Sequence, residues 1–281
     1  MKTIDIICPL YNAEGYILNL HNSIINQKNV LINNIRYILT ESEDNTEKLL
    51  KLNNINYKKI DKKYFSHSKV REKEGLESDA DILVFITQDI IIKDNKWLYK
   101  LTKDIDDEVF VAAYSRQISN NNTIEKYTRE YNYPDYTLFK YKDDVEKYGL
   151  KTFFFSDASC AISAKVFKKL NGYDGKDLPF NEDMYIAHKI IMNNYKIKYA
   201  STSVVEHSHK LKLKELYNRY KLSGQFFKEN KYFNEYKINS SGAGLAKYIL
   251  RRIVEEKRFM LLLRYPFDMA VRFMGMKAGM R

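Results

Sequence analysis

The sequence predicts an α/β fold with a mostly parallel central sheet, helices on both of its faces and a helical extension at the C-terminus. Through the first half of the chain, runs rich in Ile, Val, Tyr and Phe alternate with segments of helical periodicity. This alternation is typical of a parallel sheet that is covered on both faces. The 281 residues, 44% of them hydrophobic, are enough for one large domain with an appendage.

Five strands and four helices are expected in the first half of the chain. The strands are predicted at residues 3–8, 34–40, 56–60, 81–87 and 109–113, and the helices at residues 14–26, 46–51, 68–78 and 96–104. Ligands of such sheets bind outside the carboxyl ends of the strands. We therefore expect the site among the polar residues that follow these strands.

The second half is predicted from apolar runs and helical periodicity. An apolar run at 152–163 indicates a strand, and two short strands are expected at 196–200 and 203–206. Helices are expected at residues 164–170, 184–193, 213–229 and within 245–281. Asn, Ser and Gly cluster at 230–244, which makes this segment the best linker candidate. We expect a main domain over residues 1–230 and a linker with a basic amphipathic tail over 231–281.

The formal net charge of +11 favours anionic partners, which include nucleotide phosphates, nucleic acid and an anionic membrane surface. Charge alone does not choose among them. Asp5 and Pro9 interrupt an N-terminal apolar stretch that is too short for a signal peptide or a membrane span, so we expect a cytoplasmic protein. Cys8 and Cys160 lie in apolar segments and are expected to be buried free thiols.

Two groups of side chains could hold a metal ion or act as a base. Asp89 follows a predicted strand, where a carboxylate could also simply start a turn. His207 and His209 are two residues apart in an extended segment, so both point to one side and could share a metal site with a carboxylate, although a surface pair also explains them. Glu182 and Asp183 begin a helix, where carboxylates are favoured with or without catalysis.

These groups fit the two needs of transfer from a phosphate leaving group. A divalent cation on a strand-end carboxylate can neutralise the leaving phosphate, and an acceptor hydroxyl needs a base. Asp89 with a histidine suits the first need, and Asp183 suits the second. Lys69 and Arg71, early in a predicted helix, could meet a diphosphate, although basic residues on a solvated face are common.

Eight separated motifs occur in the order of a known family. The first four are Cys-Pro-Leu-Tyr-Asn-Ala-Glu at 8–14, Phe-Ser-His-Ser-Lys-Val-Arg at 65–71, Leu-Val-Phe-Ile-Thr-Gln-Asp at 83–89 and Tyr-Ser-Arg-Gln at 114–117. The others are Arg-Glu-Tyr-Asn-Tyr-Pro at 129–134, Phe-Phe-Phe-Ser-Asp at 153–157, Asn-Glu-Asp at 181–183 and His-Ser-His at 207–209. Over residues 5–227 the chain resembles the inverting glycosyltransferases of family 2, which have a GT-A fold, and most closely the bacterial rhamnosyltransferases.

The resemblance implies a metal-dependent enzyme with Mn²⁺ or Mg²⁺ as its cofactor. Asp89 resembles the remaining carboxylate of the family's metal-binding Asp-x-Asp element, with Thr87 in place of the first Asp, as is common in the rhamnosyltransferase-like members. His207 resembles the metal-ligand histidine, with His209 as the alternative. Asp183 resembles the catalytic base.

The resemblance also implies which residues bind the donor. Pro9, Tyr11 and Glu14 match the loop that packs on the donor base. Lys69 and Arg71 fall where the family contacts the nucleotide and diphosphate, and Arg116 and Gln117 fall near the sugar. Gln88 and Glu182, within the matched motifs, are assigned to the donor site with them.

Two departures from the family pattern concern the donor. Many relatives have Asp-Ser-Gly-Ser-x-Asp after the second strand, whereas this chain has Leu-Thr-Glu-Ser-Glu-Asp at 39–44. The nucleobase-binding Asp is therefore missing or replaced by Glu41 or Glu43, which leaves the base open. Glu72 replaces the usual Asn after Arg71, and Ser68 replaces a glycine.

The resemblance points to dTDP-β-L-rhamnose as the donor and to a saccharide acceptor, lipid-linked, in cell-surface polysaccharide synthesis. A UDP-hexose or UDP-N-acetylhexosamine is the alternative donor. A nucleic-acid-binding or scaffold protein without catalysis is the alternative of another class, since 23 Tyr and 15 Phe residues could stack on bases. No RNA-binding motif occurs, so we expect no nucleic-acid partner.

Residues 243–281 are strongly basic, with nine Lys or Arg residues against three acids. Leu245, Ile249 and Ile253 share one helical face, and residues 260–263 add an apolar patch. No stretch reaches the roughly 18 apolar residues that a membrane span needs. We expect this tail to lie on an anionic membrane at the inner face of the cell membrane. The alternative is a helical pair that packs on the main domain.

Overall fold

The computed structural model of the protein describes residues 1–237 and 241–281. It forms two compact units: Met1–Gln117, Asp135–Lys142 and Phe154–His207 make the first, and Ile118–Pro134, Asp143–Phe153 and Ser208–Arg281 make the second. Residues 238–240, inside the predicted linker 230–244, lie outside the described residues. The predicted main domain over 1–230 stays a prediction, because these units are defined by packing and not by activity.

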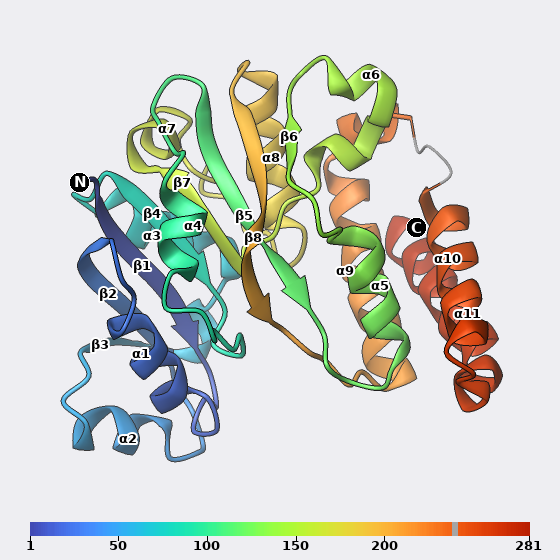
Figure 1. Cartoon of the computed structure of the whole chain (residues 1–281), viewed down its shortest axis with the longest axis horizontal. Helices are drawn as coiled ribbons and strands as arrows, with labels where there is room; N and C mark the ends of the chain where they lie inside the picture. Colours follow the sequence, from blue (N-terminus) through green and yellow to red (C-terminus); the bar gives the residue numbers. More distant parts are fainter. Residues whose placement is uncertain (238–240) are drawn as a thin grey trace. The chain divides into compact units, whose positions relative to one another are not determined.

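The first unit is built on an eight-stranded sheet in the order β3-β2-β1-β4-β7-β5-β8-β6 (Figure 1). The strands are β1 Thr3–Leu10, β2 Leu31–Thr40, β3 Tyr57–Ile60, β4 Ile82–Ile86, β5 Phe110–Ile118, β6 Leu138–Lys140, β7 Ser159–Ser163 and β8 Lys196–Glu206. The α/β class is confirmed. The sheet is mixed, however: β3, β2, β1 and β4 are parallel, whereas β7 runs antiparallel to β4 and β5, and β6 to β8.

Several strand boundaries differ from the prediction. β2 begins at Leu31, β5 continues to Ile118, and β6 was not predicted. β1 continues to Leu10, so Pro9 lies in the strand and not in the loop after it. The apolar run at 152–163 is not one strand, because Gly149–Phe153 is a 3₁₀ helix and only Ser159–Ser163 joins the sheet. Phe153 and Phe155 are buried and make ring contacts, such as Phe155 against Tyr114 with centroids 5.3 Å apart. Apolarity in this run therefore reports burial rather than strand pairing. The two short strands predicted at 196–206 form the single strand β8.

Helices cover both faces of the sheet. They are α1 Ile17–Ile25, α2 Thr46–Leu52, α3 His67–Leu76, α4 Trp97–Thr102, α7 Ala164–Lys169 and α8 Glu182–Met192. α1 and α4 share a core with one face of β1 and β4. On the other face, the ring of Phe167 in α7 packs 5.6 Å from that of Phe85 in β4. α3 approaches α7 so closely that a Cβ at Gly75 would lie 2.8 Å from the Phe167 ring.

The parallel strands bring distant loops to one edge of the sheet. β1, β2 and β4 run in the same direction and end at Leu10, Thr40 and Ile86. The loops at 11–14, 41–45 and 87–89 therefore leave the sheet at its carboxyl edge, where ligands of α/β sheets bind. The sequence prediction of the site's location rests on this arrangement.

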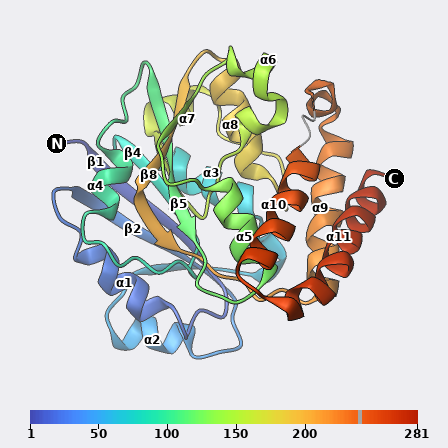
Figure 2. The same cartoon turned by 45° about the vertical axis from the view of Figure 1, so that its right-hand side comes forward.

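The second unit is helical, and the predicted helical extension is confirmed. It contains α5 Ile124–Asn132, α6 Asp144–Tyr148, α9 Leu213–Glu229, η3 Lys231–Glu235, α10 Ser241–Glu255 and α11 Phe259–Met280 (Figure 2). Ile249 and Ile253 of α10 are fully buried against Ile124 and Tyr127 of α5. The apolar face that the sequence shows on α10 is thus part of a protein core. Among the described residues, no helix is both long enough and apolar enough to cross a membrane.

α9 and α11 pack through glycines that allow their backbones to approach. A Cβ at Gly279 would overlap the carbonyl oxygen of Lys221, and one at Gly275 would overlap that of Tyr217. Beside these glycines, Arg272 Nε donates to Asp268 Oδ1 at 2.8 Å, and Arg272 Nη1 donates to the Tyr220 hydroxyl at 2.7 Å. The inward face of α11 therefore carries small and polar residues.

We expect Gly279→Ala to destabilise the second unit by about 1–3 kcal/mol, because the added methyl group overlaps backbone and not a movable side chain. Chemical unfolding followed by circular dichroism measures this change. Gly242→Ala in α10 is the matched control, since a Cβ there meets nothing within 4 Å. That control should be neutral or slightly stabilising, as alanine favours helix. Equal effects of the two substitutions would contradict close packing of α9 on α11.

Candidate functional site

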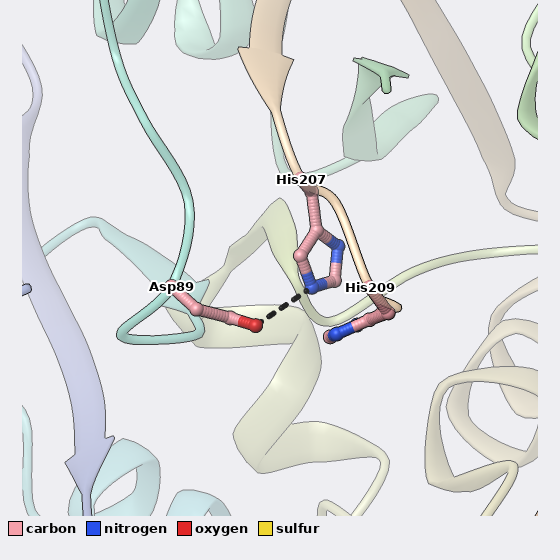
Figure 3. A group of neighbouring side chains, drawn as sticks. All are labelled: Asp89, His207 and His209. Carbon is pink, nitrogen blue, oxygen red and sulfur yellow. Dashed lines mark ion pairs between the residues drawn. The ribbon is translucent and has the colours of Figure 1, made fainter. Parts of the chain in front are cut away.

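Asp89 and His207 meet at the carboxyl edge of the sheet (Figure 3). His207 Nε2 lies 3.3 Å from Asp89 Oδ2. The imidazole is buried, whereas the carboxylate of Asp89 keeps 22% of its surface exposed. A ligand can therefore reach the pair from the side of the Asp89 carboxylate, which faces solvent.

A short backbone bridge fixes this pair. Ile91 N–H donates to Glu206 O at 2.8 Å, and Glu206 N–H donates to Ile91 O at 2.9 Å. These two hydrogen bonds form an antiparallel bridge outside the main strand ladders. Asp89 is two residues before one partner, and His207 directly follows the other. The bridge therefore sets the separation of two residues that are far apart in the sequence.

Gln117 orients the His207 ring. Its amide Nε2 donates to Ser156 Oγ at 2.7 Å, which turns its Oε1 toward His207 Nδ1 at 2.8 Å. Because that oxygen can only accept, Nδ1 carries the proton, and the lone pair of the neutral ring lies on Nε2, facing Asp89. Two electron-rich atoms 3.3 Å apart favour a cation between them, either a proton or a metal ion.

The donor set fits a divalent metal ion. One ligand atom from each of Asp89, His207 and His209 lies within 4.8 Å of the others. His209 follows His207 by two residues, and its carbonyl oxygen accepts from Asn121 Nδ2 at 2.7 Å. One carboxylate with imidazole nitrogens is a mixed oxygen and nitrogen donor set, which suits divalent first-row cations. A hydrogen-bonded second nitrogen, as Gln117 provides for His207, is usual for a ligating histidine.

Asp183 stands at the start of α8, as predicted. Asn181 before it has φ 60°, in the left-handed region, and turns the chain into the helix. The N–H of Met184 donates to Asp183 Oδ1 at 2.7 Å. Asp183 is partly exposed, and its pKa is raised well above the ordinary value, first by desolvation and then by the charges of Glu182 and Asp157. A raised pKa makes the carboxylate a stronger proton acceptor.

Arg71 is the buried cation at the centre of this acidic group. Its Nη1 pairs with Glu182 Oε1 at 2.9 Å, and its Nε lies 3.9 Å from Asp157 Oδ2. Asp157 also accepts from the Tyr173 hydroxyl at 2.7 Å. Arg71 is only 1% exposed, so it holds Glu182 and the start of α8 in place. The donor contact predicted for Arg71 and Glu182 stays a prediction.

Two buried cysteines lie near the charged groups of the site. Burial raises the pKa of the Cys8 thiol, and the charges of both Arg71 and Asp89 act on it. The charges of Arg71 and Asp183 likewise act on Cys160, whose pKa is also raised. Arg71 also acts on Asp183, because its charge lowers a pKa that desolvation raises. Both cysteines are buried and free, as predicted.

The loop after β1 is held by Gln88, which the sequence assigned to the donor site, and by Lys62, which it did not. Gln88 Oε1 accepts from the Tyr11 N–H at 2.7 Å, and Gln88 Nε2 donates to the Tyr11 carbonyl at 2.8 Å. Lys62 Nζ donates to the Tyr11 hydroxyl at 3.0 Å and lies 5.1 Å from the ring centroid. Tyr11 remains 37% exposed, so its ring presents a flat surface that the loop holds still.

The loops after β1 and β2 are joined by hydrogen bonds. Glu14 Oε2 accepts from the backbone and side-chain nitrogens of Asn45 at 3.0 and 2.9 Å. Asp44 Oδ2 accepts from the Glu14 N–H at 2.9 Å. Glu14 therefore braces the rim. Glu41 is exposed on it, and its backbone N–H donates to Ile60 O at 3.0 Å.

Two basic side chains suit an anionic ligand. Arg116, near the end of β5, is partly buried, and its Nε has no hydrogen-bond partner among the described residues. Lys69 is exposed in the first turn of α3, a helix capped by Ser66, whose Oγ accepts from the Lys69 N–H at 3.4 Å. A buried donor without a partner is costly, so a bound anion at Arg116 would relieve that cost.

The structure thus gathers Asp89, His207 and Gln117 into one cluster and Asp183, Glu182 and Arg71 into another. Sequence reasoning gave no role to Ser156, Asp157 or Lys62. Ser156 and Asp157 stood inside a recognised motif, which was the one available signal, but their partners come from other segments of the chain. The roles of all predicted site residues, including Pro9 within β1, stay predictions.

Comparisons with known proteins identify the family of this chain. Residues 5–170 match the family described as Glycosyl transferase family 2. The chain is 30% identical to the O-antigen chain rhamnosyltransferase RfbN of Salmonella typhimurium, over 98% of this chain and 89% of that relative. It is 27% identical to the O-antigen chain rhamnosyltransferase WbaN of Salmonella anatum, over 99% and 90% of the two chains.

Solved structures show the same fold at low sequence identity. The mannosyltransferase PcManGT from Pyrobaculum calidifontis, solved with GDP-Man and Mn²⁺, gives a TM-score of 0.60 at 12% identity, over 98% of this chain and 74% of that one. TarS from S. aureus, solved with UDP, gives 0.55 at 15% identity, over 99% and 91%. The GT-A fold is thereby confirmed. Since the family match covers more than half of the chain, this protein belongs to glycosyl transferase family 2.

Proposed function

We propose that this chain transfers L-rhamnose from dTDP-β-L-rhamnose to a saccharide acceptor, with inversion at the anomeric carbon, in cell-surface polysaccharide synthesis. The observation that carries this proposal is the likeness to two O-antigen chain rhamnosyltransferases over nearly the whole chain. The proposed acceptor is lipid-linked, and the proposed location is the cytoplasmic face of the cell membrane. Belonging to a transferase family weighs against the alternative of a nucleic-acid-binding or scaffold protein.

The donor is proposed to lie on the carboxyl edge of the sheet. Tyr11 offers its ring to the nucleobase, with Pro9 and the braced residues Glu14 and Gln88 supporting that loop. Arg116 and Lys69 offer positive charge to the diphosphate, and Glu41 stands where the base would be read. A flat aromatic surface and uncompensated cations are the groups that a nucleoside diphosphate requires.

Asp183 is the proposed base. Its carboxylate takes the proton of the acceptor hydroxyl while that oxygen bonds to the anomeric carbon and the bond to the diphosphate oxygen breaks. Attack on the face opposite the leaving group inverts the configuration. Asp89 and His207, with His209, would hold a Mn²⁺ or Mg²⁺ ion, which when bound neutralises charge on the diphosphate. Gln117 keeps the lone pair of His207 directed into that site.

A panel of nucleotide sugars tests the donor. With Mn²⁺ present, dTDP-rhamnose should raise the melting temperature and be slowly hydrolysed, because a ligand that binds only the folded state at about 100 times its Kd adds roughly 2.7 kcal/mol of stability. UDP-glucose and UDP-N-acetylglucosamine should do neither. If only a UDP-sugar raised the melting temperature and was hydrolysed, dTDP-rhamnose would be refuted as the donor in favour of the alternative.

Asp183→Asn should lower turnover by about 10²–10⁴-fold and leave donor affinity unchanged. The folded state should be as stable as the parent or more stable near neutral pH, because the raised pKa of Asp183 means that its charge opposes folding there. That advantage should vanish at pH about 3, where the carboxyl is protonated in both states. Initial rates and denaturant unfolding at the two pH values measure these effects. Near-normal turnover would remove Asp183 as the base.

His207→Ala should abolish Mn²⁺ binding in the absence of donor, and Gln117→Leu should weaken it by about 10–100-fold because the ring loses its orientation. Titration of Mn²⁺ followed by electron paramagnetic resonance measures the affinity directly. His209→Ala should have the smaller effect of the two histidine substitutions. His21→Ala, which removes a histidine bonded to the Tyr37 hydroxyl in another part of the unit, is the control and should change nothing. Unchanged affinity in His207→Ala would refute the site.

A further inference from the structure

The outward face of α11 is apolar along its length. Seven large apolar side chains that are exposed recur at helical spacing and form what we name the apolar stripe: Phe259, Met260, Leu263, Phe267, Phe273, Met274 and Met280. Met260 is 78% exposed and Phe273 is 68% exposed. Of the four exposed Phe residues in the described part of the chain, three belong to this stripe. Such a concentration marks an interaction surface.

The inward face of α11 is the polar one. Four of its residues are buried: Asp268, Arg272, Gly275 and Gly279. Arg272, which is paired with Asp268, donates to the Tyr220 hydroxyl of α9, and the two glycines lie against the backbone of α9. An ordinary surface helix buries its apolar side and exposes its polar side. α11 does the reverse on the side that meets α9. Other apolar residues of α11 pack against the core of α5 and α10: Leu261, Leu262, Tyr265 and Met269. That packing does not include the apolar stripe, whose side chains are exposed.

The acids of this region are paired with bases, and the bases at its ends stay exposed, although Arg258 lies 4.0 Å from Glu256. Glu256 pairs with Lys126 at 2.9 Å and with Arg252 at 2.7 Å, Glu255 pairs with Arg252 at 3.2 Å, and Asp268 is buried against Arg272. Exposed positive charges flank the apolar stripe at both ends of α11, and we name them the basic border: Lys257, Arg258, Lys277 and Arg281.

Charge complementarity selects the occupant. Two copies of this face would bring their basic borders together, which opposes self-association through it. A bilayer with anionic headgroups matches both features, since acyl chains take up the apolar side chains and headgroups pair with the basic border. α11 is about 33 Å long, but no described helix is apolar enough to span a membrane.

We propose that α11 docks on an anionic lipid bilayer, lying in its surface with the apolar stripe inserted and the basic border at the headgroups. This contact does not use the residues that the sequence singled out on α10. Ile249 and Ile253 are fully buried in the core with α5, and Leu245 packs against it. The proposal is independent of the donor and of the chemistry at Asp183.

Flotation of the full chain with vesicles tests the proposal. Wild type should float with vesicles of phosphatidylglycerol and phosphatidylethanolamine, much less with phosphatidylcholine, and less at raised salt because surface charge is screened. Phe267→Ser with Phe273→Ser should lower the partition coefficient about tenfold or more, since two large apolar groups no longer enter the bilayer. Circular dichroism should show the same folded state, because both side chains are exposed.

A matched control separates the stripe from general apolarity. Leu263 is 67% exposed in the stripe, and Leu52 is 68% exposed at the end of α2. Leu263→Ser should weaken vesicle binding, whereas Leu52→Ser should not. Flotation of the Phe267/Phe273 double variant at the wild-type level would overturn the proposal. So would a wild-type dimer in analytical ultracentrifugation that the double variant loses while neither protein binds vesicles, because the stripe would then be occupied by a second copy.

Discussion

The antiparallel backbone pair between Ile91 and Glu206 is the constraint on which the candidate metal centre depends. It ties the segment after β4 to the end of β8, and it does so with main-chain atoms that a side-chain substitution does not remove. The carboxylate of Asp89 and the ring of His207 leave this bridge from opposite strands and face one another. Gln117 adds the second condition, because it decides which nitrogen of the ring faces the carboxylate.

A second constraint is the burial of Arg71. One guanidinium lies among Glu182, Asp157 and Asp183, and its charge partly offsets theirs. This charge does not outweigh desolvation and the neighbouring carboxylates at Asp183, whose pKa stays raised. A fold selected only for stability would place a neutral amide there. Functional sites often keep such a cost, because a proton acceptor must be both reactive and held in place.

Much of the fold was predictable because strand and helix periods are local properties. Apolar alternation and helical spacing predict the positions of β1, β2, β4 and α9 along the chain. Asp89 was expected at the carboxyl edge of the sheet because it follows a predicted strand. Partners were not predictable in the same way. The sequence predicts that Arg71 binds a phosphate. In the structure its guanidinium pairs with the carboxylates of Asp157 and Glu182, which lie in other segments of the chain. The aromatic residues at 153–155 likewise indicated a core segment in the sequence, but they do not belong to a strand of the sheet.

The helices α10 and α11 show that a helical pattern does not predict what its apolar face contacts. Periodicity assigns apolar residues to one side of a helix, but it does not say whether that side meets protein or lipid. On α10 the apolar side meets α5, and burial of Ile249 and Ile253 stabilises the second unit. On α11 the glycines and the Asp268–Arg272 pair lie on the side that meets α9, so the phenylalanines lie on the exposed side. Two adjacent helices with apolar faces thus serve different ends, and only the packing distinguishes them.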